Sequence, residues 1–273
     1  MAEVTSTTGA RTAPATGPGW RAAFAFWWLQ YQRTWKGSVI SRFLMPVMFL
    51  VSMGVVLGAL VDDRAGGVDG VPYLTFVVPG ILAAQAMWLA MGESSYSVLG
   101  AIRWNMQYHA MLATPLSTTD VLLGHLAYVT VSLAFGTVVF VAVAALFGAW
   151  LSWWVLLAIP LVVLTGLAFS VPMFAFAATM REGTDSGFSL VFRFVMTPMF
   201  LFSGTFFPLE QLPVWLRALA WATPLWHGVD GSRSLALGQP DWGMLTVHTA
   251  YLVVVVGLAG WWAHRAFRRR LVV

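Results

Sequence analysis

The chain alternates long apolar runs with short polar segments. Six of the runs come close to the about 20 residues that an α-helix needs to cross a bilayer. They cover residues 39–61, 73–92, 121–147, 153–180, 188–207 and 246–263. The pattern predicts an all-α, polytopic membrane protein with six transmembrane helices, which form one domain over residues 20–273.

The longest polar interruption lies between the second and third runs, at residues 93–120. Within it, apolar residues recur at helical spacing: Val98, Ile102, Met106, Ala110 and Ala113. Polar and basic residues occupy the other faces, so residues 97–113 are predicted to form an amphipathic helix. Such a helix can lie on lipid headgroups or dock on a partner protein, because amphipathicity alone does not choose between the two.

Two local signals mark the end of this segment. The Thr114-Pro115 pair ends the helix, because the residue before a proline is pushed out of the helical region. Ser117 and Asp120 then have the spacing of a capping box, which predicts the start of the third transmembrane helix.

The amino-terminal part divides into two segments. Residues 1–19 are rich in Thr, Ala, Gly and Pro without periodicity, which predicts a flexible tail. In residues 20–37, aromatic side chains recur at helical spacing: Trp20, Phe24, Trp27, Trp28, Tyr31 and Trp35. This pattern predicts a helix that lies in the membrane interface.

The basic residues predict the orientation in the membrane. In the six-helix arrangement, 12 Lys and Arg residues fall on the side of the two termini and 3 fall on the opposite side. Because basic residues are enriched on the cytoplasmic side, both termini and residues 93–120 are predicted to be cytoplasmic.

The segment predicted to lie outside, residues 208–243, contains two short helical patterns. Pro213 can open a helix over the mostly apolar residues 214–222, and Pro224 stops it. Residues 225–237 can form a second helix. Both are too short to cross the bilayer, so we expect a re-entrant helical hairpin in the outer leaflet.

Composition supports the membrane assignment. The chain of 273 residues is 59% hydrophobic and 10% charged, with a mean hydropathy of +0.77. The net charge of +4 comes from basic residues beside apolar runs, so it reflects topology and not nucleic-acid binding. Cysteine is absent, which excludes disulfides and thiolate metal sites.

The sequence offers no catalytic cluster of its own. The five histidines show no metal-binding spacing, and the only lysine, Lys36, follows a tryptophan and not the glycine of a P-loop. Ionisable residues near the apolar runs fall close to their ends, which argues against an ion relay: Arg42, Glu93, Arg193 and His248. Uphill transport by this chain would therefore need energy from another chain.

Two stretches resemble the permease subunits of ABC-2 type exporters, especially the lipooligosaccharide (nodulation-factor) and drug-resistance branches. The first stretch is residues 73–124, with YLTFVVPGILAAQAMW and AMLATPLSTTDVLLG. The second is residues 203–238, SGTFFPLEQLPVWLRALAWATPLWHGVDGSRSLALG. With the six predicted helices, the resemblance covers most of the chain from about Trp20.

The resemblance implies a half-transporter in the bacterial plasma membrane. Two permeases, identical or related, would bind two separate ABC ATPase subunits, which hold the ATP and Mg²⁺. This chain would bind no cofactor and carry no catalytic residue. The substrate would be amphipathic, a glycolipid such as a lipooligosaccharide or a hydrophobic drug, and would move outward among membrane lipids.

The resemblance also implies roles for particular residues. Contact with the ATPase would fall to the helix over residues 97–113, at Arg103, Met106, Gln107, Tyr108 and His109. The external gate region would contain Phe206, Phe207, Pro208, Glu210, Pro213, Pro224 and His227.

Two further pairs have a structural and a functional interpretation. Glu93 could pair with Arg42 or Arg103 in a structural bridge or take part in gating. Gly54 and Gly58 form a small-residue pair that lets another helix approach closely. A lipid-modifying membrane enzyme and a passive channel are the rival functions, disfavoured because neither a catalytic cluster nor a filter sequence is visible.

Overall fold

The computed structural model describes residues 18–181 and 186–271, and the predicted tail therefore lies almost wholly outside the described part. Within α1 and η1, a few side chains, including that of Arg42, are also outside the description. The described residues form helices and loops with no strand, which confirms the all-α class.

Five helical stretches are long and apolar enough to cross a membrane among the described residues. They are Pro46–Ala65, Tyr73–Arg103, Thr118–Leu146, Val155–Thr179 and Trp242–Leu271. The second contains α3 (Tyr73–Ser94), and the last three are α6, α7 and α12. The predicted runs match α6 and α7 within three residues, because both runs are strongly hydrophobic and α6 also begins at a capping box. Ser117 and Asp120 form the predicted capping box at the start of α6.

The fifth predicted span is shorter than expected. It consists of α8 (Ser186–Val191), the π-helix η2 (Phe192–Met196) and α9 (Thr197–Phe202), which together fall below the length of the other spans. The chain leaves the helix after Phe202 and turns at Gly204, where φ is +75°. The six-span arrangement is therefore not confirmed: five long helices and one short apolar helix are present in the described residues.

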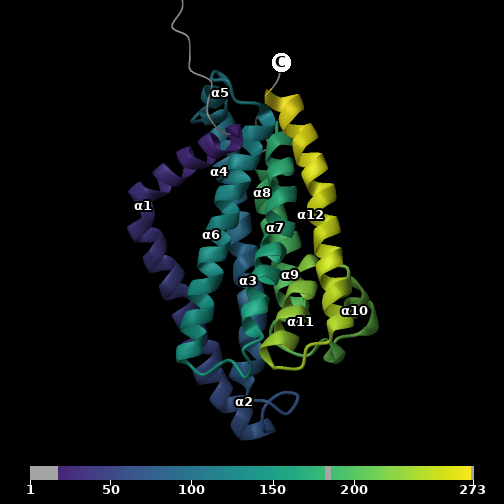
Figure 1. Cartoon of the computed structure of the whole chain (residues 1–273). Coiled ribbons are helices and arrows are strands. Elements are labelled where there is room, and N and C mark those ends of the chain that lie inside the picture. The colour runs from purple at the N-terminus through teal and green to yellow at the C-terminus, as the bar shows by residue number, and fades with distance from the viewer. Residues whose placement is uncertain (1–17, 182–185, 272–273) are drawn as a thin grey trace, which may run out of the picture.

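The predicted interface helix and the first span are one continuous helical path. α1 (Gly19–Phe49) leads through the π-helix η1 (Leu50–Leu57) into α2 (Gly58–Ala65). Figure 1 shows α1 starting beside the upper end of the bundle, leaning outward and then turning down. Pro46 lies inside α1 shortly before η1, and a proline removes one backbone hydrogen-bond donor from the helix.

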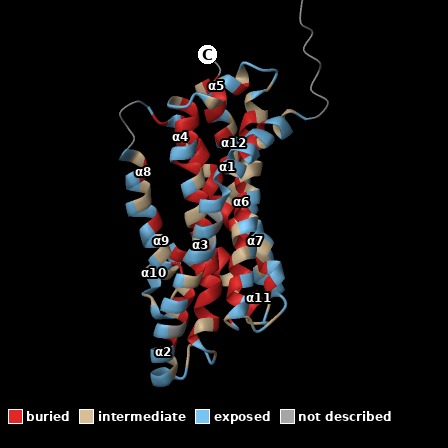
Figure 2. Ribbon diagram, turned by 90° about the vertical axis from the view of Figure 1, so that its left-hand side faces the viewer, coloured by how far each residue is buried: buried red, intermediate tan, exposed pale blue. Residues whose placement is uncertain are grey.

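α3 lies at the centre of the bundle, between α7, α6 and α11 (Pro224–Ala236). Most of its residues are buried, and Figure 2 shows the buried residues concentrated in these central helices. Gly54 lets η1 approach α3, because a methyl group there would clash with the Leu74 side chain. The predicted partner Gly58 has no such close neighbour, so only Gly54 packs as expected.

The two ends of the bundle differ. The beginning of α1, the end of α12 and α5 (Gln107–Leu112) lie at the upper end in Figure 1. α2, α11 and α10 (Val214–Trp221) lie at the lower end. Both ends of the described chain therefore share one side with the polar segment, and the predicted external hairpin lies on the other.

Candidate functional site

The polar segment between α3 and α6 is bent. α4 (Tyr96–Arg103) and α5 are separated by Trp104, Asn105 and Met106, so the single helix predicted over residues 97–113 is wrong. The backbone N–H groups of Trp104 and Asn105 both donate to the Gly100 carbonyl, which ends α4. Met106 then adopts the left-handed conformation with φ of +50°, which redirects the chain into α5. We call residues 96–112 the α4–α5 elbow.

The bend changes which residues of the elbow are buried. Val98 and Ile102 on α4 are buried, as the apolar stripe predicts. Met106 and Ala110 are exposed, because the elbow turns α5 so that Tyr108 and Met111 face the bundle instead. The stripe is therefore correct for α4 and wrong for α5.

Tyr108 is fully buried, so it cannot form part of a contact surface as predicted. Its hydroxyl lies 2.6 Å from Nδ1 of His125 on α6. Its ring lies 6.1 Å from that of Trp27 on α1 and 5.5 Å from that of Phe267 on α12. Burial raises the pKa of the Tyr108 phenol well above its usual range, so the hydroxyl stays protonated. Tyr108 fastens the elbow to three long helices.

α1 and α6 approach closely beside this anchor. The rings of Trp27 and His125 stack with centroids 3.8 Å apart. A methyl group at Gly124 would clash with Ala23, so glycine is needed at this crossing. His125 also meets Phe174 of α7 at 5.0 Å. We call Trp27, Tyr108, His125, Phe174 and Phe267 the inner aromatic cluster.

Arg103 connects the elbow to α7. Its guanidinium Nη2 donates a hydrogen bond of 2.6 Å to the carbonyl of Met180. Met180 is the C-cap residue of α7. Gln107 Nε2 lies 3.4 Å from Gln30 Oε1 of α1. Arg103 and Gln107 are predicted to contact the ATPase, yet each also holds the elbow against the helices of its own chain. His109 is half-buried on α5.

The exposed tip of the elbow consists of Trp104, Asn105 and Met106. Trp104 is 59% exposed and Met106 is 48% exposed. Trp104 is not among the predicted contact residues, although a large aromatic residue inside the longest polar segment is itself a signal for recognition. Met106 remains a predicted contact residue.

Glu93 lies at the C-terminal end of α3, beside α6. Its Oε1 accepts a hydrogen bond from the Ser132 hydroxyl at 3.3 Å. Arg42 and Arg103 are its two predicted partners, and the side chain of Arg42 lies outside the described residues, so the pairing stays a prediction.

The predicted hairpin is present as α10 and α11, preceded by the short 3-10 helix η3 (Leu209–Gln211). Pro213 is the residue before α10, and Pro224 is the first residue of α11, whose start is capped by the Thr223 hydroxyl. α11 inserts between α3, α7 and α12. A methyl group at Gly228 would come 2.5 Å from the Thr165 hydroxyl, which shows how closely α11 and α7 pack.

Arg233 of α11 joins several elements at the lower end of the bundle in Figure 1, and it is not among the predicted site residues. Its Nε donates to the Phe76 carbonyl at 3.1 Å, and its Nη2 to the Gly204 and Thr205 carbonyls at 2.7 and 3.3 Å. The guanidinium carbon lies 4.0 Å from the centroid of the Phe76 ring. One cation thus joins α11, α3 and the turn that follows α9.

The gate residues predicted around this turn are dispersed. Phe206 and Phe207 are half-buried, and Phe206 accepts a hydrogen bond from the Tyr73 hydroxyl through its carbonyl. Pro208 is buried, whereas Glu210 is exposed. Arg217 of α10 donates to the Glu210 carbonyl. These contacts hold the turn after α9 and the start of α10 close to α3 at one end of the described bundle.

His227 lies in a polar chain that links α11 to α12, in which the two histidines are buried and Asp230 is half-exposed. Its Nδ1 lies 2.8 Å from Nδ1 of His248, and Nε2 of His248 lies 3.0 Å from Oδ2 of Asp230. The His227 ring stacks on Tyr251 with centroids 3.9 Å apart. Among the described residues, no group of three or more His, Asp or Glu side chains is arranged to hold a metal ion.

Comparison with known proteins agrees with this architecture. Residues 20–237 match the family model described as ABC-2 type transporter. The chain belongs to this family. It is 31% identical over 265 residues to Nodulation protein J of Rhizobium leguminosarum bv. viciae, covering 96% of this chain and 99% of that protein. It is 33% identical over 230 residues to Nodulation protein J of Rhizobium meliloti (strain 1021), covering 83% and 84%.

A third relative is the inner membrane transport permease YadH of Escherichia coli (strain K12), 27% identical over 231 residues, covering 83% of this chain and 86% of that protein. Membership of the ABC-2 type transporter family makes this chain a multi-pass membrane permease. The matched region contains the elbow and the hairpin of α10 and α11, and ends just after α11.

Proposed function

We propose that this ABC-2 permease is the membrane half of an ATP-driven exporter that moves an amphipathic substrate outward. Two ABC ATPase subunits, which hold the ATP and Mg²⁺, dock on the side of the bundle that carries the termini. A second permease, identical or related, completes the pathway. The observation that carries this proposal is the α4–α5 elbow, whose tip is exposed while its base is fastened to the bundle.

The elbow has the construction that a coupling element requires. Trp104 and Met106 offer an exposed apolar surface, and large exposed aromatic residues often dominate the binding energy of an interface. Tyr108 and Arg103 pass a displacement of the tip to α6 and to the end of α7. The push of an ATPase subunit is thereby distributed over several transmembrane helices.

The outer hairpin supplies the opposite end of the pathway. Arg233 holds α11 by hydrogen bonds to the carbonyls of three residues. His227 and Asp230 hold it to α12, because both contact His248 of that helix. These contacts support the proposal that helices α10 and α11 close the outer side before export. Export requires this closure to open, and we propose that movement of α7 and α12 against α11 opens it.

The substrate is proposed to be a glycolipid, such as a lipooligosaccharide, or a hydrophobic drug. The sequence resemblance to exporters of both kinds supports this range, and the relatives include proteins named for nodulation and for transport. The membrane location is proposed to be the bacterial plasma membrane, with both termini in the cytoplasm, as the distribution of basic residues indicates.

Co-purification with export measurements tests this function. The permease is expressed together with the ABC ATPase of the same operon, and the ATPase is expected to purify with it. Inverted membrane vesicles that contain both are expected to accumulate a fluorescent amphiphile only when ATP is supplied. If the ATPase never associates and export of the amphiphile survives deletion of the permease gene, the exporter assignment is wrong.

A further inference from the structure

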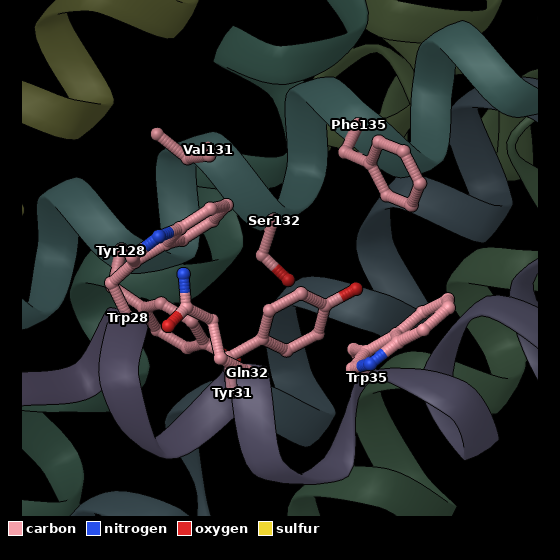
Figure 3. A pocket seen from close by; sticks show the side chains of 8 residues that line it. All are labelled: Trp28, Tyr31, Gln32, Trp35, Tyr128, Val131, Ser132 and Phe135. Atoms are coloured by element: carbon pink, nitrogen blue, oxygen red, sulfur yellow. The ribbon is translucent and has the colours of Figure 1, made fainter.

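Two cavities lie side by side between α1 and α6, near the elbow. Figure 3 shows the first, which has a volume of about 410 Å³ and an almost wholly apolar lining. Trp28 and Trp35 of α1 face Val131 and Phe135 of α6 across it. A hydrocarbon chain fits such a lining, because burying apolar surface is its main source of binding energy.

The second cavity has a volume of about 440 Å³ and a mixed lining. Amide groups come from Gln30 of α1 and from Asn105 and Gln107 of the elbow, and a hydroxyl comes from Ser97 of α4. Glu93 at the end of α3 adds a carboxylate. These groups can donate to and accept from a hydrogen-bonding ligand.

The two cavities share part of their walls. Tyr31 and Tyr128 line both, with ring centroids 6.2 Å apart. The hydrogen bond from Ser132, which lines the apolar cavity, to Glu93, which lines the polar one, spans the same boundary at 3.3 Å. A molecule that occupies both cavities must therefore be apolar at one end and hydrogen-bonding at the other.

We infer that these joined cavities are the loading site for the exported amphiphile, with its hydrocarbon chain against α6 and an uncharged, hydroxyl-bearing head group beside the elbow. This inference rests on the proposed function. Each cavity lies in the size range typical of small-molecule sites.

The lining argues for an uncharged head group. Among the described residues that line the polar cavity, none is a lysine or an arginine, whereas phosphate is usually bound by such cations. Amides and hydroxyls instead suit the many donors and acceptors of a sugar. A membrane phospholipid therefore matches the apolar cavity and mismatches the polar one.

The position of the site links substrate loading to the movement of the elbow that the ATPase drives. Asn105 and Gln107 belong to the elbow and also form part of the polar wall. A displacement of the elbow by the ATPase therefore alters the head-group cavity directly. The head group would be released from the elbow when the ATPase pushes.

Photolabelling in nanodiscs tests the loading site. The probe is an alkyl glucoside with a diazirine in its dodecyl chain, and the reference probe is phosphatidylglycerol with the same group in an acyl chain. The glucoside is expected to label peptides that contain residues 28–35 and 128–135 at least about tenfold more than the phosphatidylglycerol probe, a difference of about 1.4 kcal/mol.

Two matched variants of α6 test where the hydrocarbon chain of the probe binds. Val131→Phe fills the apolar cavity and is expected to reduce labelling by about tenfold. Val138→Phe is the matched control, because Val138 is also a valine of α6 and is similarly exposed, at 49% against 40% for Val131. Val138 lines a different cavity, so labelling of this variant should persist. Gln30→Leu removes an amide from the polar cavity, so it should weaken labelling by the glucoside. Labelling by a diazirine hydrocarbon without a head group should stay unchanged.

Equal labelling by phosphatidylglycerol, or undiminished labelling of Val131→Phe, would overturn the loading site and identify a lipid-filled crevice. The ATPase is expected to purify with Val131→Phe as with the wild-type chain. Failure of the proposed function would instead appear as loss of the ATPase from the wild-type complex, so the two failures are distinguishable.

Discussion

The hydroxyl of Tyr108 on α5 lies 2.6 Å from Nδ1 of His125 on α6, and both side chains are buried. This hydrogen bond fastens a short helix, at the end of the bundle that carries the termini, to a long apolar helix. Because buried polar groups are costly to leave without a partner, the bond also fixes the position of α5. The elbow is therefore a rigid extension of the bundle at its base and an exposed surface at its tip.

Tyr108→Phe removes the hydroxyl and leaves Nδ1 of the buried His125 without this partner. We expect a loss of stability of about 1–3 kcal/mol, the usual cost of an unsatisfied buried polar group. The measurement is thermal unfolding of the purified permease in detergent. The control is Tyr96→Phe, since Tyr96 is 46% exposed on the neighbouring α4 and should change stability by less than about 0.5 kcal/mol. Equal shifts in the two variants would refute the anchoring role.

Trp104→Ala tests the tip of the elbow. Trp104 is 59% exposed, so its removal should leave unfolding of the permease nearly unchanged. If the tip docks on the ATPase, association should weaken by about 2 kcal/mol, or roughly 30-fold, as for aromatic residues that dominate an interface. Titration of the purified ATPase onto the permease in nanodiscs measures this affinity. Trp153→Ala is the control, because Trp153 is 86% exposed in the connection from α6 to α7, away from the elbow.

Arg233 tests the closure of the outer end. Arg233→Ala removes donors to the carbonyls of Phe76, Gly204 and Thr205, and we expect a loss of stability of about 3 kcal/mol or more, since hydrogen bonds from a charged group are each worth about 1.5–3 kcal/mol. Arg233→Lys keeps the charge but not the fork of donors, so it should restore only part of the loss. Arg217→Ala, whose hydrogen bonds stay next to α10, is the control and should cost less.

Gly228→Ala tests the insertion of α11 into the bundle. The added methyl group would lie 2.5 Å from the Thr165 hydroxyl, so we expect a loss of about 1–3 kcal/mol from overpacking. The same change at Gly257 on α12 meets nothing within 4 Å and should stabilise the helix slightly, because alanine has the higher helix propensity. A Gly228→Ala variant as stable as Gly257→Ala would show that α11 is not packed against α7 in the membrane.

The parts of this fold that sequence predicted are those coded locally. The capping box of Ser117 and Asp120 gives the start of α6. Pro213 and Pro224 mark the two hairpin helices. Each of these signals acts within a few residues, so periodicity and capping rules were sufficient to find the elements.

The parts that sequence could not predict depend on contacts between distant segments. Met106 takes a left-handed conformation, but this position has no glycine that would indicate a turn, so the pattern predicts one helix. The burial of Tyr108 follows from its meeting with His125, 17 residues later. Arg233 binds carbonyls of α3 and of the turn after α9, 157 and about 28 residues away, which no local pattern encodes. Tertiary packing, rather than propensity, decides all three.

Cysteine labelling tests the orientation and the length of the membrane-spanning part. The chain contains no cysteine, so single cysteines can be introduced without removing others. Thr118→Cys lies at the start of α6 and Gln211→Cys in η3, at opposite ends of the bundle. We expect a membrane-impermeant maleimide to label Gln211→Cys in intact spheroplasts and Thr118→Cys only after the membrane is opened, because the distribution of basic residues predicts a cytoplasmic α6 start. Labelling of both positions from the same side would mean that the short path through α8, η2 and α9 does not cross the membrane, or that α6 and α7 are not a spanning pair.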